Sequence, residues 1–351
     1  MKSKIQTIKT EVEKEIEKFF SEEDFRKKFL LDKVVDYQDF SDIFELIKYM
    51  LESGGKRWRA ILVILSARAL KNDFHFSQYK DRDDILFQLA AVVELIHTAS
   101  LIHDDIEDSS ETRRGKAAAH IKFGLDIALN SGSWLYFFPL QNLQQLNINS
   151  SLKELIIGFT IKAIYCLHLG QALDINWHRD ATYFPPLEKY EEMIKLKTGT
   201  LAWLASCFGA CIMEVEAVRR ENFSMVMQEL GIAFQILDDI KNITTGVVGK
   251  NKGDDIVEGK KSLPVIFHVQ TNPNDKEKLT RLFEKSKIEG INSSAVEDAI
   301  SLLNSSDCIT RAKTYAKEKI ASVKAELTKI SYNEQGLKEL LFFIDQLVPL
   351  D

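Results

Sequence analysis

No proline precedes Pro139 in this chain of 351 residues, which has only 6 proline and 16 glycine residues in all. Proline removes a backbone donor and clashes with the preceding helical turn, so its scarcity suits long helices. Apolar residues recur at the three- and four-residue spacing of amphipathic helices. With 45% hydrophobic residues, the chain can bury one large core. A loop-rich β protein is therefore not expected.

The apolar pattern predicts an all-α protein with short breaks between helices. Because the pattern continues through the breaks, one domain spanning residues 1–351 is predicted. Helices are expected over residues 5–20, 40–53, 56–71, 83–107, 117–130, 132–145, 150–177, 187–213, 218–241, 260–270, 275–285, 293–304, 306–329 and 334–347.

Charge and cysteine content narrow the classes of function. The formal net charge of -6 gives no general attraction to nucleic acid or to an anionic membrane. The four cysteines form no CxxC pair, which favours a reduced, cytoplasmic protein. No apolar signal core opens the chain, and no uninterrupted apolar run approaches the ~18 residues of a membrane span, so none is predicted.

The segment SLIHDDIEDSSETRRGKAAAH carries a first acidic motif at the end of an apolar helix. Asp104 and Asp108 are four residues apart, which places their carboxylates on one helix face, with Asp105 beside them. Mg²⁺ binds one or two carboxylates together with substrate phosphate oxygens. The cations Arg113 and Arg114 follow and suit a phosphate. Alone, the acidic motif could equally be a solvated helix end.

A second acidic motif repeats this arrangement in FQILDDIKN and the loop after it. Asp238 and Asp239 end another apolar helix, and Asn242 takes the i+4 position. The following loop supplies Lys250 and Lys260. Two such clusters facing each other across a bundle would hold a diphosphate with several metal ions, and the pair is far more specific than either half.

Four motifs carry a resemblance to a known family: GGKRWR at 54–59, DDIED at 104–108, LKTG at 196–199 and FQILDDIKN at 234–242. Their order and spacing over about residues 54–264 resemble the trans-polyprenyl diphosphate synthases. With DINWHRD at 174–180, the chain looks most like the geranylgeranyl diphosphate synthases. Residues 270–351 read as helical scaffold, with no site assigned.

The resemblance implies an antiparallel helical bundle around a deep apolar cavity, usually as a homodimer. The implied reaction is head-to-tail transfer of an allylic group (dimethylallyl, geranyl or farnesyl) to isopentenyl diphosphate through an allylic carbocation, with three Mg²⁺ ions and bound diphosphate. The matching positions imply a role for each site residue. The implied metal ligands are Asp104, Asp105, Asp108 and Asp238, with Asp239 and Asn242 in support. The implied contacts of the allylic diphosphate are Arg113, Lys197, Lys250 and Lys260, and those of isopentenyl diphosphate are Lys56, Arg59, His97 and Arg114. Thr198 and Gln235 are implied to face the cation.

Product length is expected to depend on the residues before the first motif. Ala99 and Ser100 are small where bulky aromatics stop the family's fifteen-carbon synthases, so a twenty-carbon product is predicted. Ile96, one turn deeper, or Tyr136 on a neighbouring helix is expected to form the floor. Other product lengths stay open. A class I terpene cyclase would not need the isopentenyl diphosphate set, and a non-catalytic partner subunit would not need both acidic motifs.

Overall fold

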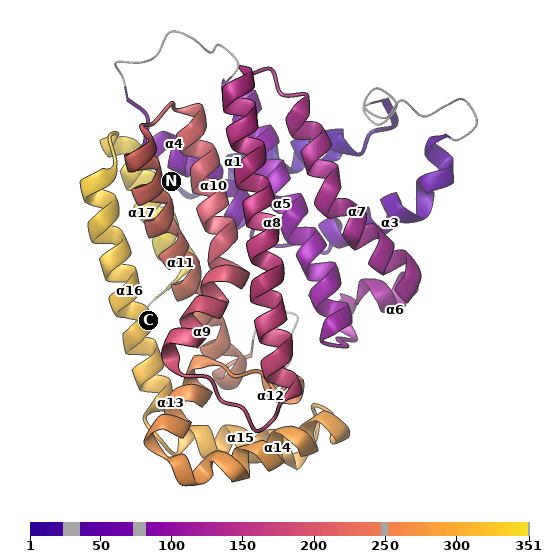
Figure 1. Ribbon diagram of the computed structural model, residues 1–351, viewed down its shortest axis with the longest axis vertical. Helices are drawn as coiled ribbons and strands as arrows, with labels where there is room; N and C mark the ends of the chain where they lie inside the picture. Colours follow the sequence, from indigo (N-terminus) through magenta and orange to yellow (C-terminus); the bar gives the residue numbers. More distant parts are fainter. Residues whose placement is uncertain (24–35, 73–81, 247–251, 350–351) are drawn as a thin grey trace.

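The computed structural model describes residues 1–23, 36–72, 82–246 and 252–349. Long helices stand side by side as a bundle, and two shorter helices lie across one end of it (Figure 1). The prediction of an all-α fold is confirmed, since the described strands are a single two-stranded hairpin. The long helices are α1 (Lys2–Phe19), α3 (Ser41–Glu52), α4 (Trp58–Ala69), α5 (Arg82–Glu107), α7 (Leu125–Gln144), α8 (Ser150–Arg179), α10 (Thr200–Ile212), α11 (Ala217–Thr244), α16 (Cys308–Ile330) and α17 (Glu334–Leu347).

The remaining elements connect and close the bundle. Helices α14 and α15 are the pair that lies across its end (Figure 1). These elements are η1 (Tyr37–Phe40), strands β1 (Thr112–Arg113) and β2 (Lys116–Ala117), α6 (Ala119–Phe123), α9 (Leu187–Ile194), η3 (Lys195–Gly199), α12 (Asp254–Glu258), α13 (Leu263–Thr271), η4 (Pro273–Asp275), α14 (Lys276–Glu289) and α15 (Ser294–Asn304).

The core is organised around α10, in which every residue is buried. A helix that is apolar on all sides belongs inside a bundle rather than at its surface. Helix α4 packs closely against it, because at Gly209 an added Cβ would lie 2.6 Å from the carbonyl oxygen of Val63. The central helix of the bundle is thus held by a backbone approach that only glycine permits.

The predicted helix over 187–213 is interrupted by the π-helical segment η3 (Lys195–Gly199). Two glycines of neighbouring helices make room for this wider turn. A Cβ at Gly170 of α8 would lie 2.4 Å from the Lys197 nitrogen, and one at Gly231 of α11 would lie 2.7 Å from the Gly199 Cα. The segment therefore lies tightly between α8 and α11, and Lys197 and Thr198 face the space between these helices.

The predicted helices 117–130 and 132–145 are also divided differently. The break lies at Gly124, whose φ of +92° ends α6, and α7 continues unbroken through Gly132. Gly132 serves packing instead, since an added Cβ there would lie 2.5 Å from the His103 ring.

Helices α5 and α8 are each long and apolar enough, by length and composition, to cross a membrane. Their surroundings differ. In the most apolar window of α5, 72% of the residues are buried, as expected of a core helix, whereas in α8 only 28% are. The described chain thus leaves a long apolar face of α8 uncovered, with Ile161, Tyr165 and Leu169 exposed at four-residue spacing.

Candidate active site

One cavity of about 780 Å³ opens between the ends of α5 and α11, the middle of α8 and the start of α4. It brings together residues that are far apart in the sequence. The predicted site residues that line it are Lys56, Arg59, His97, Ser100, Asp104, Arg113, Arg114, Lys197, Thr198, Gln235, Asp238, Asp239, Asn242 and Lys260. Lys250 lies outside the described residues.

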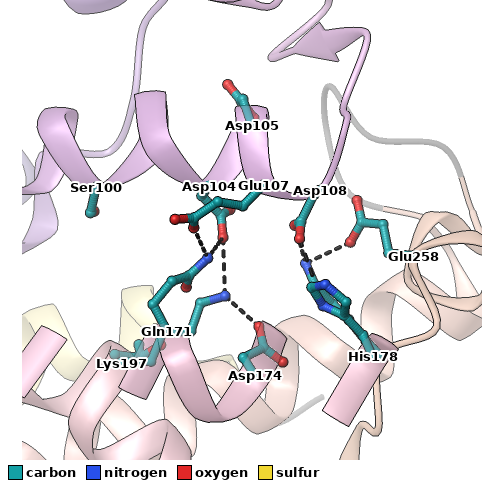
Figure 2. Close-up of polar contacts among 12 residues, drawn as sticks. Ser100, Asp104, Asp105, Glu107, Asp108, Gln171, Asp174, His178, Lys197 and Glu258 are labelled. Atoms are coloured by element: carbon teal, nitrogen blue, oxygen red, sulfur yellow. Dashed lines mark hydrogen bonds and ion pairs between the residues drawn. The ribbon is translucent and has the colours of Figure 1, made fainter. Parts of the chain in front are cut away.

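The first acidic end of the cavity is defined as Asp104, Asp105 and Asp108. Asp104 makes most of its contacts with the cavity. Its carboxylate accepts hydrogen bonds from Lys197 Nζ at 3.0 Å and Gln171 Nε2 at 3.0 Å (Figure 2). Arg113 Nη2 lies 3.2 Å from it. Three donors from three elements thus converge on one carboxylate.

Asp108 lies one turn further on, behind the cavity lining, with a side chain only 1% exposed. Lys260 Nζ donates to its Oδ2 at 2.9 Å. Its Oδ1 has no hydrogen-bond partner among the described residues, and His178 Nδ1 is 3.9 Å from it. Burial raises the pKa of Asp108 to about 6, although Lys260 favours the ionised form. An unpartnered buried oxygen of this kind can accept a cation.

Asp105 points away from this face of α5, as Figure 2 shows. One residue along a helix is a rotation of about 100°, so Asp105 cannot share the face of Asp104 and Asp108. It is fully buried and bonded to Arg113, whose Nε donates to Asp105 Oδ1 at 2.8 Å. The structure thus gives Asp105 a contact that orients Arg113, and its implied role as a metal ligand stays a prediction.

The turn of the β1–β2 hairpin explains why the side chains of the neighbouring residues Arg113 and Arg114 point to different parts of the cavity. Arg114 and Gly115, between β1 and β2, both have positive φ, which is typical of a two-residue type I′ turn. Arg113 points to the first acidic end, whereas Arg114 Nη1 donates to the Gly54 carbonyl. Gly55 makes room for this guanidinium, since an added Cβ would lie 2.9 Å from Arg114 Nη1.

Two residues on α8 had no role in the sequence-based prediction. Asp174 accepts from Lys197 Nζ at 2.5 Å, and Gln171 donates to both Asp104 and Glu107 (Figure 2). Burial lowers the pKa of Lys197, but Asp104 and Asp174 more than offset this and raise it. Gln171 and Asp174 are polar residues three apart on an otherwise apolar helix, and this spacing was the signal in the sequence that could have identified them.

The second acidic end is defined as Asp238, Asp239 and Asn242. Asp238 lines the cavity, and no cation pairs with it among the described residues. Asp239 instead turns inward and accepts hydrogen bonds from Tyr190 and from Gln235, both at 2.8 Å. Burial raises the pKa of Asp239 to about 6.

A hydrogen-bonded chain runs from Asp239 back to the cavity. Thr198 Oγ1 donates to Gln235 Oε1 at 2.9 Å, and Gln235 Nε2 donates to Asp239. Tyr190, only 1% exposed, anchors its far end. Asp239 thereby orients Gln235, so that the predicted pair Thr198 and Gln235 lie together at the cavity.

The amide of Asn242 is engaged with the backbone. Its Oδ1 accepts from the Asp255 N–H at 3.2 Å, and the side chain is nearly fully buried. This contact joins α11 to α12, which leads to Lys260. The structure supports a role in holding this loop, and a role of Asn242 as a metal ligand stays a prediction.

The basic cluster, defined as Lys56, Arg59, His97 and Arg114, forms a separate part of the cavity. Arg59 Nη1 lies 3.2 Å from His97 Nε2, and its guanidinium stacks over Trp58 at 4.3 Å. Burial lowers the pKa of Arg59 to about 10. Burial and the surrounding arginines hold the pKa of His97 well below its usual value, so this histidine is neutral at pH 7.

The residues predicted to set product length are only partly in the cavity. Ser100, four residues before Asp104, lines it, whereas Ala99 and Ile96 are fully buried in the core outside the lining. Ala99 and Ile96 lie five and eight residues before Asp104, which rotates their side chains by about 140° and 80° from it. Their role in setting product length stays a prediction. Tyr136 of α7 does line the cavity.

The donor set fits a hard divalent cation. Asp104 and Asp238 line one cavity, and Asp108 offers an unpartnered buried oxygen. Carboxylate oxygens are the ligands that Mg²⁺ prefers. Within the described ranges, however, no three His, Cys, Asp or Glu side chains are placed to hold a metal ion together. The described side chains alone therefore do not form a complete metal cage.

Comparisons of this chain with a family model, with curated proteins and with solved structures all point to the same family. The polyprenyl synthetase family model matches residues 41–302. A geranylgeranyl pyrophosphate synthase of Neocamarosporium betae is 35% identical over 268 residues, covering 74% of this chain and 73% of the relative. The structure of a geranylgeranyl pyrophosphate synthetase from Pyrococcus horikoshii has a TM-score of 0.82 at 27% identity, with 99% and 97% of the two chains covered.

A further structural likeness concerns the fold alone. The geranylgeranyl pyrophosphate synthase of Corynebacterium glutamicum, solved with isoprenyl diphosphate and magnesium, has a TM-score of 0.81 at 19% identity, covering 97% of this chain and 98% of that one. The resemblance inferred from the four motifs is confirmed by the family match. This chain is therefore a member of the polyprenyl synthetase family.

Proposed function

We propose that this protein joins isopentenyl diphosphate head to tail to an allylic diphosphate and releases geranylgeranyl diphosphate. One observation carries the proposal: a single cavity holds two acidic ends and a separate basic cluster. The acidic ends suit a metal-bound diphosphate that leaves, and the basic cluster suits a diphosphate that stays on the product. A terpene cyclase, with one substrate, would need no such second subsite.

Asp104, Asp108 and Asp238 are the residues that we propose to hold Mg²⁺, and three ions with a bound diphosphate fit the incomplete protein cage. The Corynebacterium glutamicum synthase, which has the same fold and was solved with magnesium and isoprenyl diphosphate, supports magnesium as the metal. Bound magnesium supplies positive charge that offsets the charge growing on the leaving diphosphate. Lys197 and Arg113 contact Asp104, Lys260 contacts Asp108, and all three add fixed positive charge there.

The reaction starts when the allylic C–O bond breaks and its electron pair stays on the ester oxygen, which leaves as part of the diphosphate. The remaining allylic cation faces the oxygens of Thr198 and Gln235, which are held by their mutual hydrogen bond. The double bond of isopentenyl diphosphate then attacks the cation, and the released diphosphate takes the proton. Apolar lining residues such as Leu101, Leu167 and Leu201 exclude water, which would quench the cation.

The product length that we propose, twenty carbons, rests on the small Ser100 beside the first acidic end and on Tyr136 of α7, which also lines the cavity. Ser100→Phe would place a ring in the cavity, so we expect a shift toward a fifteen-carbon product. Ala99→Phe is the matched control, because Ala99 is buried outside the lining. We expect it to reduce stability by about 1–3 kcal/mol through overpacking without shortening the product.

A homodimer in the cytoplasm is the form in which we propose that the protein works. The exposed stripe Ile161, Tyr165 and Leu169 on α8 is apolar and contiguous, as an interface core requires. Tyr165→Glu should convert a dimer to a monomer in light scattering. The control is Ile288→Glu on α14, which is 86% exposed and distant in sequence from the stripe. A dimer that persists in Tyr165→Glu would argue against this interface.

The test of the proposed function is incubation of the purified protein with Mg²⁺, isopentenyl diphosphate and farnesyl diphosphate, followed by mass analysis of the dephosphorylated products. We expect a dominant twenty-carbon alcohol that requires metal. A longer product would support the proposed reaction but contradict the proposed length of the cavity. No condensation with any allylic primer would contradict the proposal and favour a silent subunit or a cyclase.

A further inference from the structure

The loop between α3 and α4 contains three residues with left-handed backbone conformation. Gly54, Gly55 and Arg57 have φ angles of 86°, 139° and 51°. Glycine adopts such angles freely, but the Cβ of an arginine makes them unfavourable. A residue in this conformation persists only where its surroundings hold it. Arg57 therefore needs contacts that fix its side chain.

Glu94 of α5 provides the main contact. Arg57 Nη1 donates to Glu94 Oε1 at 2.8 Å, and the two side chains are only 4% and 3% exposed. Arg57 Nη2 donates to the Leu51 carbonyl of α3 at 2.5 Å, and its Nε lies 3.7 Å from the Glu13 carboxylate of α1. One buried guanidinium thus ties three helices to the start of α4.

The residues on either side of Arg57 belong to the basic cluster. Lys56 precedes it and lies over the Phe234 ring, and Arg59 is on the first turn of α4. Arg59 contacts His97, which is three residues after Glu94 and so shares its face of α5. Both Glu94 and Arg57 line the cavity. A shift of the Arg57 backbone would move both Lys56 and Arg59.

Glu94 also acts on the charges of the cluster. Burial lowers the pKa values of Arg59 and Arg114, and the Glu94 carboxylate opposes this effect on both. The four cations Lys56, Arg57, Arg59 and Arg114 outnumber the nearby carboxylates Glu94 and Glu13, of which Glu13 lies 3.7 Å from Arg57, so an excess of positive charge is left for an anionic ligand. The Glu94 carboxylate itself would repel a diphosphate and is already bonded to Arg57.

We propose that Glu94, acting through Arg57, is a positioning residue for the subsite that binds the diphosphate of isopentenyl diphosphate. This inference rests on the proposed function. Glu94 holds the turn from Lys56 to Arg59 against α5, so that the cations are in place before the substrate arrives. Pre-ordering of this kind reduces the entropy lost on binding.

The test is steady-state condensation with each substrate varied in turn. Glu94→Ala should raise the KM for isopentenyl diphosphate roughly tenfold or more, because a buried ion pair is broken. The KM for farnesyl diphosphate should stay within about twofold, since its subsite lies at the acidic ends. Glu94→Gln keeps an oxygen for Arg57 and should raise the KM for isopentenyl diphosphate only about threefold.

Glu339→Ala is the matched control. Glu339 is 7% exposed and accepts from Arg68 at 2.9 Å, near the opposite end of α4. We expect it to lower Tm without changing either KM. Equal rises in both KM values for Glu94→Ala, or values equal to those of the control, would overturn the inference. If Glu94→Ala does not fold by circular dichroism, Glu94→Gln serves for the same comparison. A wild type without condensation would refute the proposed function, and this inference with it.

Discussion

The first and second acidic ends have almost the same sequence pattern, but their surroundings differ. At the first end, Lys197, Lys260 and Arg113 pair with the carboxylates. At the second end, Asp239 is bonded to uncharged Tyr190 and Gln235, and Asp238 has no cation partner among the described residues. The two acidic motifs therefore form sites with different partners, although their sequences are alike.

The difference indicates that the two acidic ends have different roles. At the first end, Lys197, Lys260 and Arg113 compensate the charge of the buried carboxylates. At the second end, one carboxylate is open and the other supports the Thr198–Gln235 pair through a hydrogen-bonded chain. Substitutions at the two ends should separate these roles.

The largest effect is expected for Asp104→Ala at the first end. Its carboxylate orients Lys197, Gln171 and Arg113, in addition to its proposed metal role. We expect kcat/KM for condensation to fall about 10²–10³-fold, as for loss of one preorganised electrostatic group. The control is Asp298→Ala, an exposed carboxylate on α15, which should retain full activity. A loss of less than tenfold in Asp104→Ala would contradict the central place of Asp104.

Asp108→Asn should change how stability depends on pH. Burial raises the pKa of Asp108 to about 6, above the ~3.9 of an unfolded chain. The stability from its protonation is therefore fully present below pH ~4 and is lost as pH rises through about 6. The variant cannot ionise, so it should gain about 1–2 kcal/mol relative to wild type between pH 5 and pH 7.5.

Urea unfolding of metal-free Asp108→Asn and wild type at these two pH values measures this gain. Asp298→Asn, whose carboxyl group is exposed, should show no such relative gain. A difference between Asp108→Asn and wild type that does not change with pH would show that Asp108 is already ionised in the folded protein at pH 5.

Tyr190→Phe tests the hydrogen-bonded chain at the second end. It removes one donor to Asp239 while keeping the buried ring. We expect kcat to fall roughly three- to tenfold, because a typical hydrogen bond contributes about 0.5–1.5 kcal/mol. The KM for isopentenyl diphosphate should not change, since that subsite lies at the basic cluster. An unchanged kcat would show that Gln235 is oriented without Tyr190.

Asn242→Asp should have the smallest effect. The oxygen that accepts from Asp255 N–H is retained, so the loop toward Lys260 should keep its place. We expect kcat/KM to change less than about threefold, with the magnesium concentration at half-maximal rate unchanged. A marked fall in the magnesium requirement would instead identify position 242 as a metal ligand.

Much of this protein could be predicted from its sequence, because helical periodicity and motif spacing are local. The all-α fold, the helix ends that carry Asp104 and Asp238, and the membership of a prenyltransferase family are confirmed. The rotation of Asp105 away from Asp104 was also open to prediction, since it follows from 3.6 residues per turn alone.

What the sequence determined by itself is therefore the all-α class, most of the helices, the acidic and basic residues at their ends, and the family. The tertiary structure decided which partner each side chain has. The π-helical turn at Lys195–Gly199 depends on Gly170 and Gly231 of two other helices. Asp174 and Tyr190 reach the site from α8 and α9. These contacts join residues distant in sequence, and spacing along one helix carries no information about them.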